Sequence, residues 1–258
     1  MDNEVLIEFN HVTMNFDSPS GTVNVLNDVN FTMKKGEKLC VVGPSGCGKT
    51  TILNLIAGFI MPTKGEVKIN GKQVESPGAD RTVVFQKDAV YPWLTVRKNL
   101  EFGPKVRGMK PEEYSDRVER YLKKVKLMDF ADRYPKELSG GMRKRVDIAR
   151  AYVNSPQILL MDEPFGALDV MTKEDMQNDL LQMVNDEKTS FLFITHDIEE
   201  AVYIGDRVLV MTARPSLVRA DIRIPFGDER THLLKRTADF QKLRGEIDDI
   251  FKEGENHS

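Results

Sequence analysis

Cysteine and long apolar runs are both scarce in this 258-residue sequence. Its two cysteines, Cys40 and Cys47, lie seven residues apart, which does not suggest a disulfide or a metal site. The apolar stretch 55–61, one of the longest, contains Gly58 and falls well short of the ~18–20 residues that span a membrane. Residues 1–4 are acidic and lack the apolar core of a signal peptide. We therefore expect the chain to remain in the cytosol, and any membrane association to arise through a partner.

An excess of charge of one sign is also missing. The sequence has 37 basic and 40 acidic residues, a net charge of −3, so we expect no nucleic-acid partner. Hydrophobic residues make up 40% and charged residues 30%, which is typical of a globular protein with an ample core. A chain of this length can form one large α/β domain or a core with a smaller subdomain.

Residues 43–50 carry the most informative motif. They match the pattern G-x-x-x-x-G-K-[ST], with an apolar run at 38–42 before them and a helix-like run at 51–57 after them. This strand–loop–helix context predicts a loop that binds a nucleoside triphosphate. The residues expected to contact the nucleotide are Gly43, Pro44, Ser45, Gly46, Cys47, Gly48, Lys49, Thr50 and Thr51.

Each residue type in this loop has a chemical reason to be there. The glycines let successive backbone N–H groups point at phosphate oxygens, at the positive end of the following helix. Lys49 brings a positive charge to the outer phosphates, and the Thr50 hydroxyl suits Mg²⁺. We also predict that the loop N–H groups and Lys49 lower the pKa of Cys47, so that alkylating this thiol blocks nucleotide binding.

The N-terminal part of the sequence is rich in predicted strands. Residues 5–9 alternate weakly between apolar and polar side chains, and residues 25–33 resemble a second strand. Residues 66–72 alternate and turn at Asn70-Gly71, a strong hairpin signal. The helix after the phosphate loop is expected to end at Gly58.

A helical segment follows this strand-rich part. Apolar residues fall at helical spacing after Pro111, which suits a first helical position. A second helix is predicted from about Gly141 to Val153, ending before Ser155-Pro156. We therefore expect a helical subdomain between β-rich parts of the chain.

Short apolar strands resume at 158–161, 191–194 and 208–211, separated by helical stretches. This order indicates βαβ units, and hence an α/β fold: a P-loop NTPase core with a mainly parallel sheet, an N-terminal antiparallel β subdomain and an inserted helical subdomain. We expect one domain over 1–258, with the core and its β subdomain at 1–89 and 157–215, the helical subdomain at 90–156, and a C-terminal extension at 216–258. The apolar spacing between Leu233 and Phe251 favours an amphipathic helix packed on its own domain.

Two carboxylates, Asp162 and Glu163, follow the apolar strand at 158–161. Ligands bind at the carboxyl ends of strands in open parallel sheets. Asp162 can hold Mg²⁺, directly or through water, opposite Thr50. Glu163 points elsewhere and can act as the base for an attacking water. The alternative is a polar strand end without a role.

Three further places in the sequence hold candidates whose local signals are weaker. Ser139, Gly140 and Gly141 begin a basic helix and form a second anion-binding terminus, although Ser-Gly-Gly alone is only a helix N-cap. Gln86 ends a predicted strand and could bridge Mg²⁺ and the attacking water, or be an exposed loop amide. His196 also ends a strand and is a candidate sensor of the terminal phosphate, although a lone histidine is more often structural.

These motifs in this order resemble those of the ATP-binding-cassette ATPases over nearly the whole chain. They are the Walker A sequence at 43–50, Gln86 of the Q-loop, the signature at 138–142, the Walker B sequence at 158–163, the D-loop at 167–169 and His196 of the switch. The resemblance implies ATP and Mg²⁺ as cofactors, with Mg²⁺ ligands at Thr50, Gln86 and Asp162. It further implies a head-to-tail homodimer with two ATP molecules, each between Walker A of one subunit and the signature of the other.

Two positions vary from the usual family pattern. Phe16 would stack on adenine, where the family often has Tyr, so the ring face is kept and the hydroxyl is lost. The fifth signature residue is Met142 in place of the usual Gln. Because Ser139 and the glycine N–H groups carry most of the phosphate recognition, we expect ATP binding to survive. The contribution of the Met142 side chain stays open.

A finer resemblance concerns the loops around these motifs. Residues 84–86, 92–96, 162–169 and 195–201 look like those of the importer ATPases for nitrate, sulfonate, taurine and bicarbonate. The resemblance implies a membrane permease, bound on its cytoplasmic side, and an extracytoplasmic solute-binding protein as partners. Contacts with the permease would involve Tyr91, Pro92 and Trp93, for which local packing is the alternative.

Other members of the superfamily remain rivals. A chromosome or repair ATPase or a translation factor would need a coiled-coil insertion or a second cassette, and the sequence has neither. An exporter subunit or an assembly ATPase, such as one serving iron–sulfur clusters, stays open, since direction of transport is supported only by resemblance. The transported solute is not encoded here, because in this scheme the ATPase never touches it.

Overall fold

The computed structural model describes residues 4–19 and 21–255. By its internal contacts the chain divides into two compact units, one formed by Met1–Gly78 with Lys188–Ser258 and the other by Ala79–Glu187. We call them the first and the second unit.

The first unit contains an antiparallel sheet built on a long hairpin. Its strands are β1 (Val5–Ser18), β2 (Gly21–Lys34), β4 (Lys64–Ile69) and β5 (Lys72–Gln73), in the order β2-β1-β4-β5. The predicted strands are present, but β1 and β2 are much longer than expected and pair through several register shifts. Asn70 and Gly71 both have positive φ, 51° and 71°, as a tight two-residue hairpin turn requires.

The same unit contains the parallel part of the α/β core. Strand β3 (Lys38–Val42) is completely buried between two parallel neighbours, β8 (Ser190–Thr195) and β9 (Arg207–Met211). Strand β10 (Val218–Arg223) adds an antiparallel edge beside β9. Near-continuous apolar strands of this kind are typical of a sheet covered on both faces.

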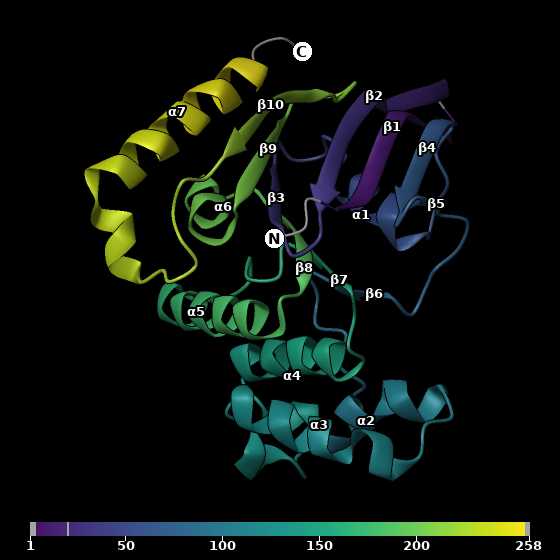
Figure 1. Cartoon of the computed structure of the whole chain (residues 1–258), viewed down its shortest axis with the longest axis vertical. Coiled ribbons are helices and arrows are strands. Elements are labelled where there is room, and N and C mark those ends of the chain that lie inside the picture. The colour runs from purple at the N-terminus through teal and green to yellow at the C-terminus, as the bar shows by residue number, and fades with distance from the viewer. Residues whose placement is uncertain (1–3, 20, 256–258) are drawn as a thin grey trace. The chain divides into compact units, whose positions relative to one another are not determined.

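The α-helices that the structure describes in this unit are α1 (Lys49–Ala57), α6 (Ile198–Ile204) and α7 (Ala238–Glu255). Helix α1 ends at Gly58 as predicted, where φ is +79° and a Cβ would lie 2.4 Å from the carbonyl oxygen of Ser76. Helix α7 packs against α6 and β9 and fully buries Phe240 and Ile247, which confirms an amphipathic tail helix on its own domain (Figure 1). It begins only after Thr237, so Leu233 stays exposed in a short 3₁₀ helix, His232–Arg236.

The second unit is mainly helical. It contains the parallel strands β6 (Arg81–Val84) and β7 (Ile158–Asp162) and the helices α2 (Val96–Val106), α3 (Pro111–Lys124), α4 (Gly140–Val153) and α5 (Val170–Glu187). Two 3₁₀ helices, Met128–Phe130 and Pro135–Glu137, connect α3 to α4. Helices α2, α3 and α4 pack on one another (Figure 1). They all fall inside the predicted range 90–156, whose status as a subdomain stays a prediction.

Local signals explain where these helices begin. Pro111 is the first residue of α3, and the Thr95 side chain caps α2 by accepting a hydrogen bond from the Lys98 backbone N–H. Tyr121 of α3 and Tyr152 of α4 are both buried, with ring centroids 5.6 Å apart. This aromatic pair lies at the junction of the two helices.

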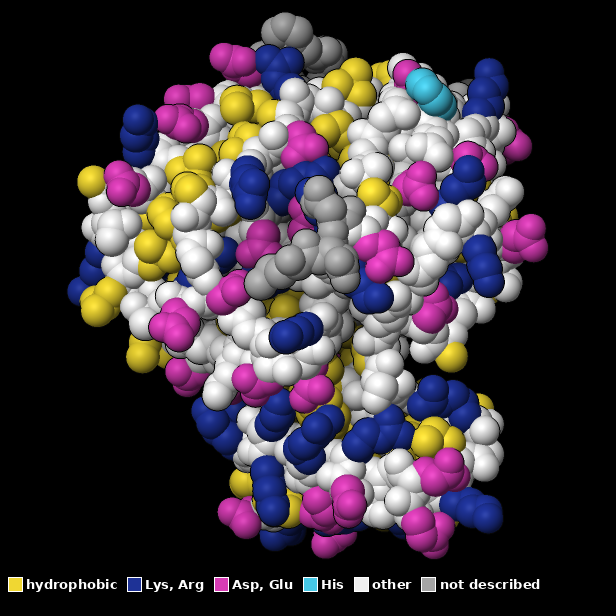
Figure 2. All heavy atoms as spheres, in the orientation of Figure 1, with side chains coloured by type: hydrophobic (Ala, Val, Ile, Leu, Met, Phe, Trp, Pro, Cys, Tyr) yellow, Lys and Arg dark blue, Asp and Glu magenta, His cyan; other side chains and the backbone are white. Residues whose placement is uncertain are grey.

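The surface carries charge of both signs. Figure 2 shows basic and acidic side chains interspersed over one face, in keeping with the small net charge. Within the described residues, no helix is both long enough and apolar enough to cross a membrane.

Candidate nucleotide-binding site

The predicted phosphate loop connects β3 to α1 and takes a shape that only glycine permits at several positions. Gly46 and Gly48 have φ of +77° and +111°. A Cβ on Gly48 would lie 2.9 Å from side-chain atoms of both Val25 and Leu26 in β2. A Cβ on Gly43 would lie 2.7 Å from Cys47 Sγ. The curled backbone therefore depends on the absence of side chains, as a loop that wraps phosphate requires.

Lys49 is the first residue of α1 and is almost fully buried. Its Nζ donates hydrogen bonds to the carbonyl oxygens of Gly43 and Pro44, at 2.7 and 3.0 Å. Thr50 and Ser45 are exposed, Thr51 is half-buried, and the α1 N-terminus lies next to the loop. The ammonium group is thus held inside the loop, beside the backbone groups expected to bind phosphate.

The predicted low pKa of Cys47 is wrong. Its side chain is only 1% exposed, and burial raises the pKa of the thiol above its usual value. Lys49 and nearby backbone hydrogen bonds act in the opposite direction, but desolvation of the thiolate outweighs them. Cys40, buried in β3, also has a raised pKa because of burial. Neither thiol is therefore an activated nucleophile.

The register of the parallel strands places His196 near the phosphate loop. Val42 of β3 pairs with Thr195 of β8, so the residues that follow, Gly43 and His196, leave the sheet at the same edge. His196 is exposed. The turn after it is held by Asp197, whose carboxylate caps α6 by accepting from the Glu200 N–H. A hydrogen bond of 2.5 Å from Thr195 Oγ1 to Glu200 Oε2 fixes the strand end.

Phe16, the predicted adenine platform, lies on β1 opposite Val23 and is 38% exposed. An aromatic face is therefore accessible in the same unit as the phosphate loop. Its stacking on adenine stays a prediction.

The second unit brings Gln86 and Glu163 together. They follow the adjacent parallel strands β6 and β7, in which Val84 pairs with Met161. The Gln86 amide Nε2 donates to Glu163 Oε2 at 3.3 Å. Glu163 has a φ of +42°, unusual for a residue with a side chain, directly after the half-buried Asp162 that ends β7. An amide and a carboxylate are thus held within hydrogen-bonding distance at the end of two strands.

Ser139, Gly140 and Gly141 begin α4 as predicted. The Ser139 side chain is the N-cap and accepts a hydrogen bond from the Met142 N–H at 3.3 Å. A Cβ on Gly141 would lie 2.6 Å from Cγ2 of Thr172 in α5. Asp169 of the D-loop in turn accepts from the Thr172 N–H, and this bond lowers the pKa of the Asp169 carboxyl. The two helix starts are therefore closely packed.

A group of charged side chains on α4, missed by the sequence analysis, holds the segment that carries Gln86. It consists of Arg143, Lys144, Asp147 and Arg150, and we call it the α4 charge cluster. The Lys144 Nζ donates to the carbonyl oxygens of Phe85 and Gln86 at 2.9 and 3.2 Å. Asp147 accepts from the Ala89 N–H at 3.0 Å, and Arg150 donates to the Ala89 carbonyl oxygen at 2.7 Å. Arg143 pairs with Asp88 at 2.7 Å.

Lys144 and Asp147 are both buried, so their charges have lost water. Burial lowers the pKa of Lys144 and raises the pKa of Asp147. Arg150 forms an ion pair with Asp147 at 2.8 Å, which offsets part of the free-energy cost of removing the Asp147 carboxylate from water. The one sequence signal was the spacing of Lys144, Asp147 and Arg150, three residues apart within this basic helix.

Residues 91–93 divide into a packed and an open part. The Tyr91 ring lies against Phe102, at 4.4 Å between centroids, and under the Arg150 guanidinium at 4.9 Å. Asn99 fixes its backbone through bonds to both the N–H and the carbonyl oxygen of Tyr91. Trp93, in contrast, is 68% exposed.

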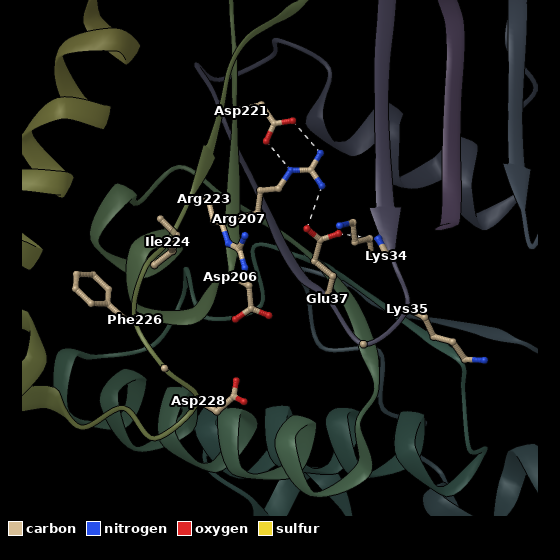
Figure 3. Close-up of a pocket in the computed structure, with 12 residues that line it drawn as sticks. Lys34, Lys35, Glu37, Asp206, Arg207, Asp221, Arg223, Ile224, Phe226 and Asp228 are labelled. Carbon is tan, nitrogen blue, oxygen red and sulfur yellow. Dashed lines mark hydrogen bonds and ion pairs between the residues drawn. The ribbon is translucent and has the colours of Figure 1, made fainter. Parts of the chain in front are cut away.

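A cavity of about 660 Å³ lies at the other edge of the first unit's parallel strands (Figure 3). It is lined by residues that precede β3 and β9, such as Glu37 and Asp206. Arg207 is paired there with Glu37 at 3.0 Å and Asp221 at 2.5 Å. Because ligands of parallel sheets bind at the carboxyl ends of strands, this amino-edge cavity is not where the phosphate loop would hold a nucleotide.

The phosphate loop between a buried parallel strand and a helix defines the first unit as part of an α/β P-loop nucleotide-binding fold. Comparison with known proteins agrees with this. A sequence model of the family described as "ABC transporter" matches residues 26–166. The chain therefore belongs to the ABC transporter family and is an ATP-binding ATPase subunit of it.

Curated relatives align over nearly their whole length. A protein from Jannaschia sp. (strain CCS1) named taurine import ATP-binding protein TauB is 43% identical over 92% of this chain and 90% of its own. A nitrate import ATP-binding protein, NrtD of Synechocystis sp., is 43% identical over 95% of both chains. Among solved structures, the dimeric ATP-binding cassette MJ0796 bound to ADP and Pi superposes with a TM-score of 0.75 and 31% identity, over 86% of this chain and 100% of that one.

Proposed function

We propose that this chain is the ATP-hydrolysing subunit of an importer that takes up a small anion, of the nitrate, sulfonate, taurine or bicarbonate class, through a separate membrane permease. The main support is the near-complete alignment with proteins named as taurine and nitrate import ATP-binding proteins. Two such chains would form a head-to-tail homodimer, bound to the cytoplasmic face of the permease. The dimeric cassettes among the structural neighbours support this assembly.

The residues of each unit have distinct roles in this proposal. The loop N–H groups and Lys49 bind the phosphates of ATP, and Phe16 stacks on the adenine ring. Ser139, at the start of α4, binds the γ-phosphate held by the other subunit. The phosphate loop leads into the N-terminus of α1, and Ser139 lies at the N-terminus of α4. At both helix N-termini the backbone N–H groups and the helix dipole favour an anion.

Hydrolysis needs a water, a base and a group that orients them. Glu163 acts as the base, and its contact with the Gln86 amide supports a shared role in positioning the attacking water. His196 senses the terminal phosphate from the edge at which β8 ends.

The donor set fits Mg²⁺ as a cofactor. Thr50, Gln86 and Asp162 offer a hydroxyl, an amide oxygen and a carboxylate, and Mg²⁺ prefers such oxygen ligands together with substrate phosphates and water. When bound with ATP, the ion would neutralise charge on the phosphates. Thr50 is exposed at the start of α1, which suits a ligand that meets its ion only with the nucleotide.

The permease would contact the segment around Trp93. Its large exposed ring supports this role, whereas Tyr91 is held by Phe102, Arg150 and Asn99 and acts as packing behind it. Trp93→Ala should lower permease-stimulated ATPase activity while leaving the basal ATPase activity unchanged. A solute-binding protein on the outer side would act through the permease without touching this chain.

The test is a gentle affinity purification of the full chain from native membranes, with every co-purifying protein identified. A polytopic permease is expected, and its solute-binding protein can then be screened with nitrate, taurine, sulfonates and bicarbonate. Recovery with cytosolic partners only would overturn the importer and leave the ATPase. In parallel, Lys49→Ala should weaken ATP binding, and Glu163→Gln should bind ATP as a trapped dimer with little turnover.

A further inference from the structure

The turn between β9 and β10 lies directly beside the phosphate loop. Val210 of β9 pairs with Val42 of β3, so the two strands end at the same edge. A Cβ on Gly43 would lie 2.9 Å from Met211 Cβ, the last residue of β9. The turn, residues 212–217, therefore starts in contact with the first residue of the loop.

This turn is fixed by hydrogen bonds on both sides. Internally, the Thr212 N–H donates to the Leu217 carbonyl oxygen at 3.1 Å, and Ser216 Oγ donates to the Thr212 carbonyl oxygen at 2.8 Å. Externally, Ser216 pairs with β2 through its N–H to Val25 and its carbonyl oxygen to the Asn27 N–H. Ser216 is fully buried, and its side chain also bonds to Cys47 of the loop.

Arg214, near the middle of this turn, reaches the middle of the phosphate loop. Its Nη2 lies 2.7 Å from the position that a Cβ on Gly46 would occupy, so the guanidinium covers the open side of that glycine. Arg214 is exposed. Across residues 4–19 and 21–255, it takes part in no ion pair or side-chain hydrogen bond, in contrast to Arg207 and Arg230 of the same unit.

The exposed guanidinium of Arg214 places a positive charge beside the phosphate loop, where it would attract an anion. The loop presents backbone N–H groups, and Lys49 is already buried within it. A guanidinium offers a planar fork of N–H donors that matches two phosphate oxygens at once. A polyphosphate chain on the loop would supply the acceptors that Arg214 lacks.

We propose that Arg214 is a further phosphate-contacting residue of the nucleotide site, supplied by the β9–β10 turn and lying outside every recognised motif of the chain. This inference rests on the proposed binding of ATP at residues 43–50. It assigns to the turn a specific part in holding the polyphosphate, with Ser216 and Thr212 as the residues that keep the turn in place.

The test compares Arg214→Ala, Arg214→Lys and a matched control, Arg223→Ala, in the full-length protein. Arg223 is an exposed arginine on β10 that lines the amino-edge cavity. For each variant we would measure the Kd of ATP, competition by inorganic tripolyphosphate, and the melting temperature without ligand. Tripolyphosphate is included because it has no base or ribose, so it isolates recognition of phosphate.

Loss of one charge-assisted contact should weaken both ATP and tripolyphosphate by about tenfold in Arg214→Ala. Arg214→Lys should recover part of the affinity, Arg223→Ala should bind as the native protein does, and the ligand-free melting temperatures should agree. The inference is overturned if Arg214→Ala binds tripolyphosphate as tightly as the native protein, or if its ligand-free melting temperature falls enough to account for the loss. Absence of ATP binding by the native protein would instead overturn the proposed function itself.

Discussion

Removing the buried carboxylate of Asp147 should destabilise the protein measurably. Asp147→Ala leaves Lys144 without one of its charged neighbours, Arg150 without its 2.8 Å partner, and the Ala89 N–H without an acceptor. Breaking a buried ion pair costs about 3–5 kcal/mol. Here Lys144 keeps two carbonyl acceptors and Arg150 keeps the Ala89 carbonyl oxygen, so we expect a loss at the low end, about 3 kcal/mol.

Thermal unfolding followed by circular dichroism measures this loss. For a chain of this size, about 3 kcal/mol corresponds to a melting temperature lower by roughly 6–12 °C. Asp116→Ala on α3 is the matched control, since Asp116 is exposed and such a surface change stays within about 0.5 kcal/mol. An unchanged melting temperature in Asp147→Ala would refute the idea that the α4 charge cluster holds the Gln86 segment.

The pH dependence of Asp147→Asn tests the same cluster by a different route. Burial raises the pKa of Asp147 above its usual 3.8, so the stability contributed by this group is fully present below that pH and declines as pH rises through the folded-state pKa. Asparagine does not titrate. The stability of the variant relative to the native protein should therefore improve from about pH 4 upward. If the variant instead becomes relatively less stable, the attraction of Lys144 and Arg150 outweighs the cost of burial.

Three further predictions concern the loops. Because burial raises the pKa of both Cys40 and Cys47, neither thiol of the native protein should react readily with a thiol reagent at pH 8, and both should react after denaturation. Rapid labelling of the native protein that ATP prevents would show that Cys47 is an activated thiol after all. Gly48→Ala should weaken ATP binding at least about tenfold in calorimetry, since a Cβ meets Val25 and Leu26 at 2.9 Å with φ at +111°; native affinity would show that the loop can relax. Ser139→Ala should lower the free energy of unfolding by about 1 kcal/mol, because the N-cap of α4 is lost, whereas Ser139→Asn should largely retain the native stability. Equal melting temperatures for the two variants would show that the loss of stability does not come from the N-cap.

Elements with strong local signals were predicted well from the sequence. The end of α1 at Gly58, the start of α3 at Pro111 and the turn at Asn70-Gly71 each follow from a residue with a special backbone preference. The lengths of β1 and β2 could not be predicted, because register shifts between these strands break the alternation of apolar and polar residues that marks a strand.

The site shows the same division between local and tertiary information. The phosphate loop, Gln86, Glu163 and Ser139 could be predicted as site residues because each lies beside the strand or helix that positions it. Cys47 was misjudged because it is buried beside Ser216, which lies far away in sequence. Asp147 and Arg214 were missed for the same reason, since their neighbours Ala89 and Gly46 come from other segments.

The α4 charge cluster has a consequence for chimeric transporters. Side chains of residues 143–150 form hydrogen bonds with backbone groups of residues 85–89. The two segments are therefore best exchanged together when parts of this chain are swapped with those of a relative. A graft of the Gln86 segment from a relative that lacks a carboxylate at position 88 would leave Arg143 without its 2.7 Å partner. Exchanging residues 85–89 and 143–150 together keeps the Arg143–Asp88 pair matched as well.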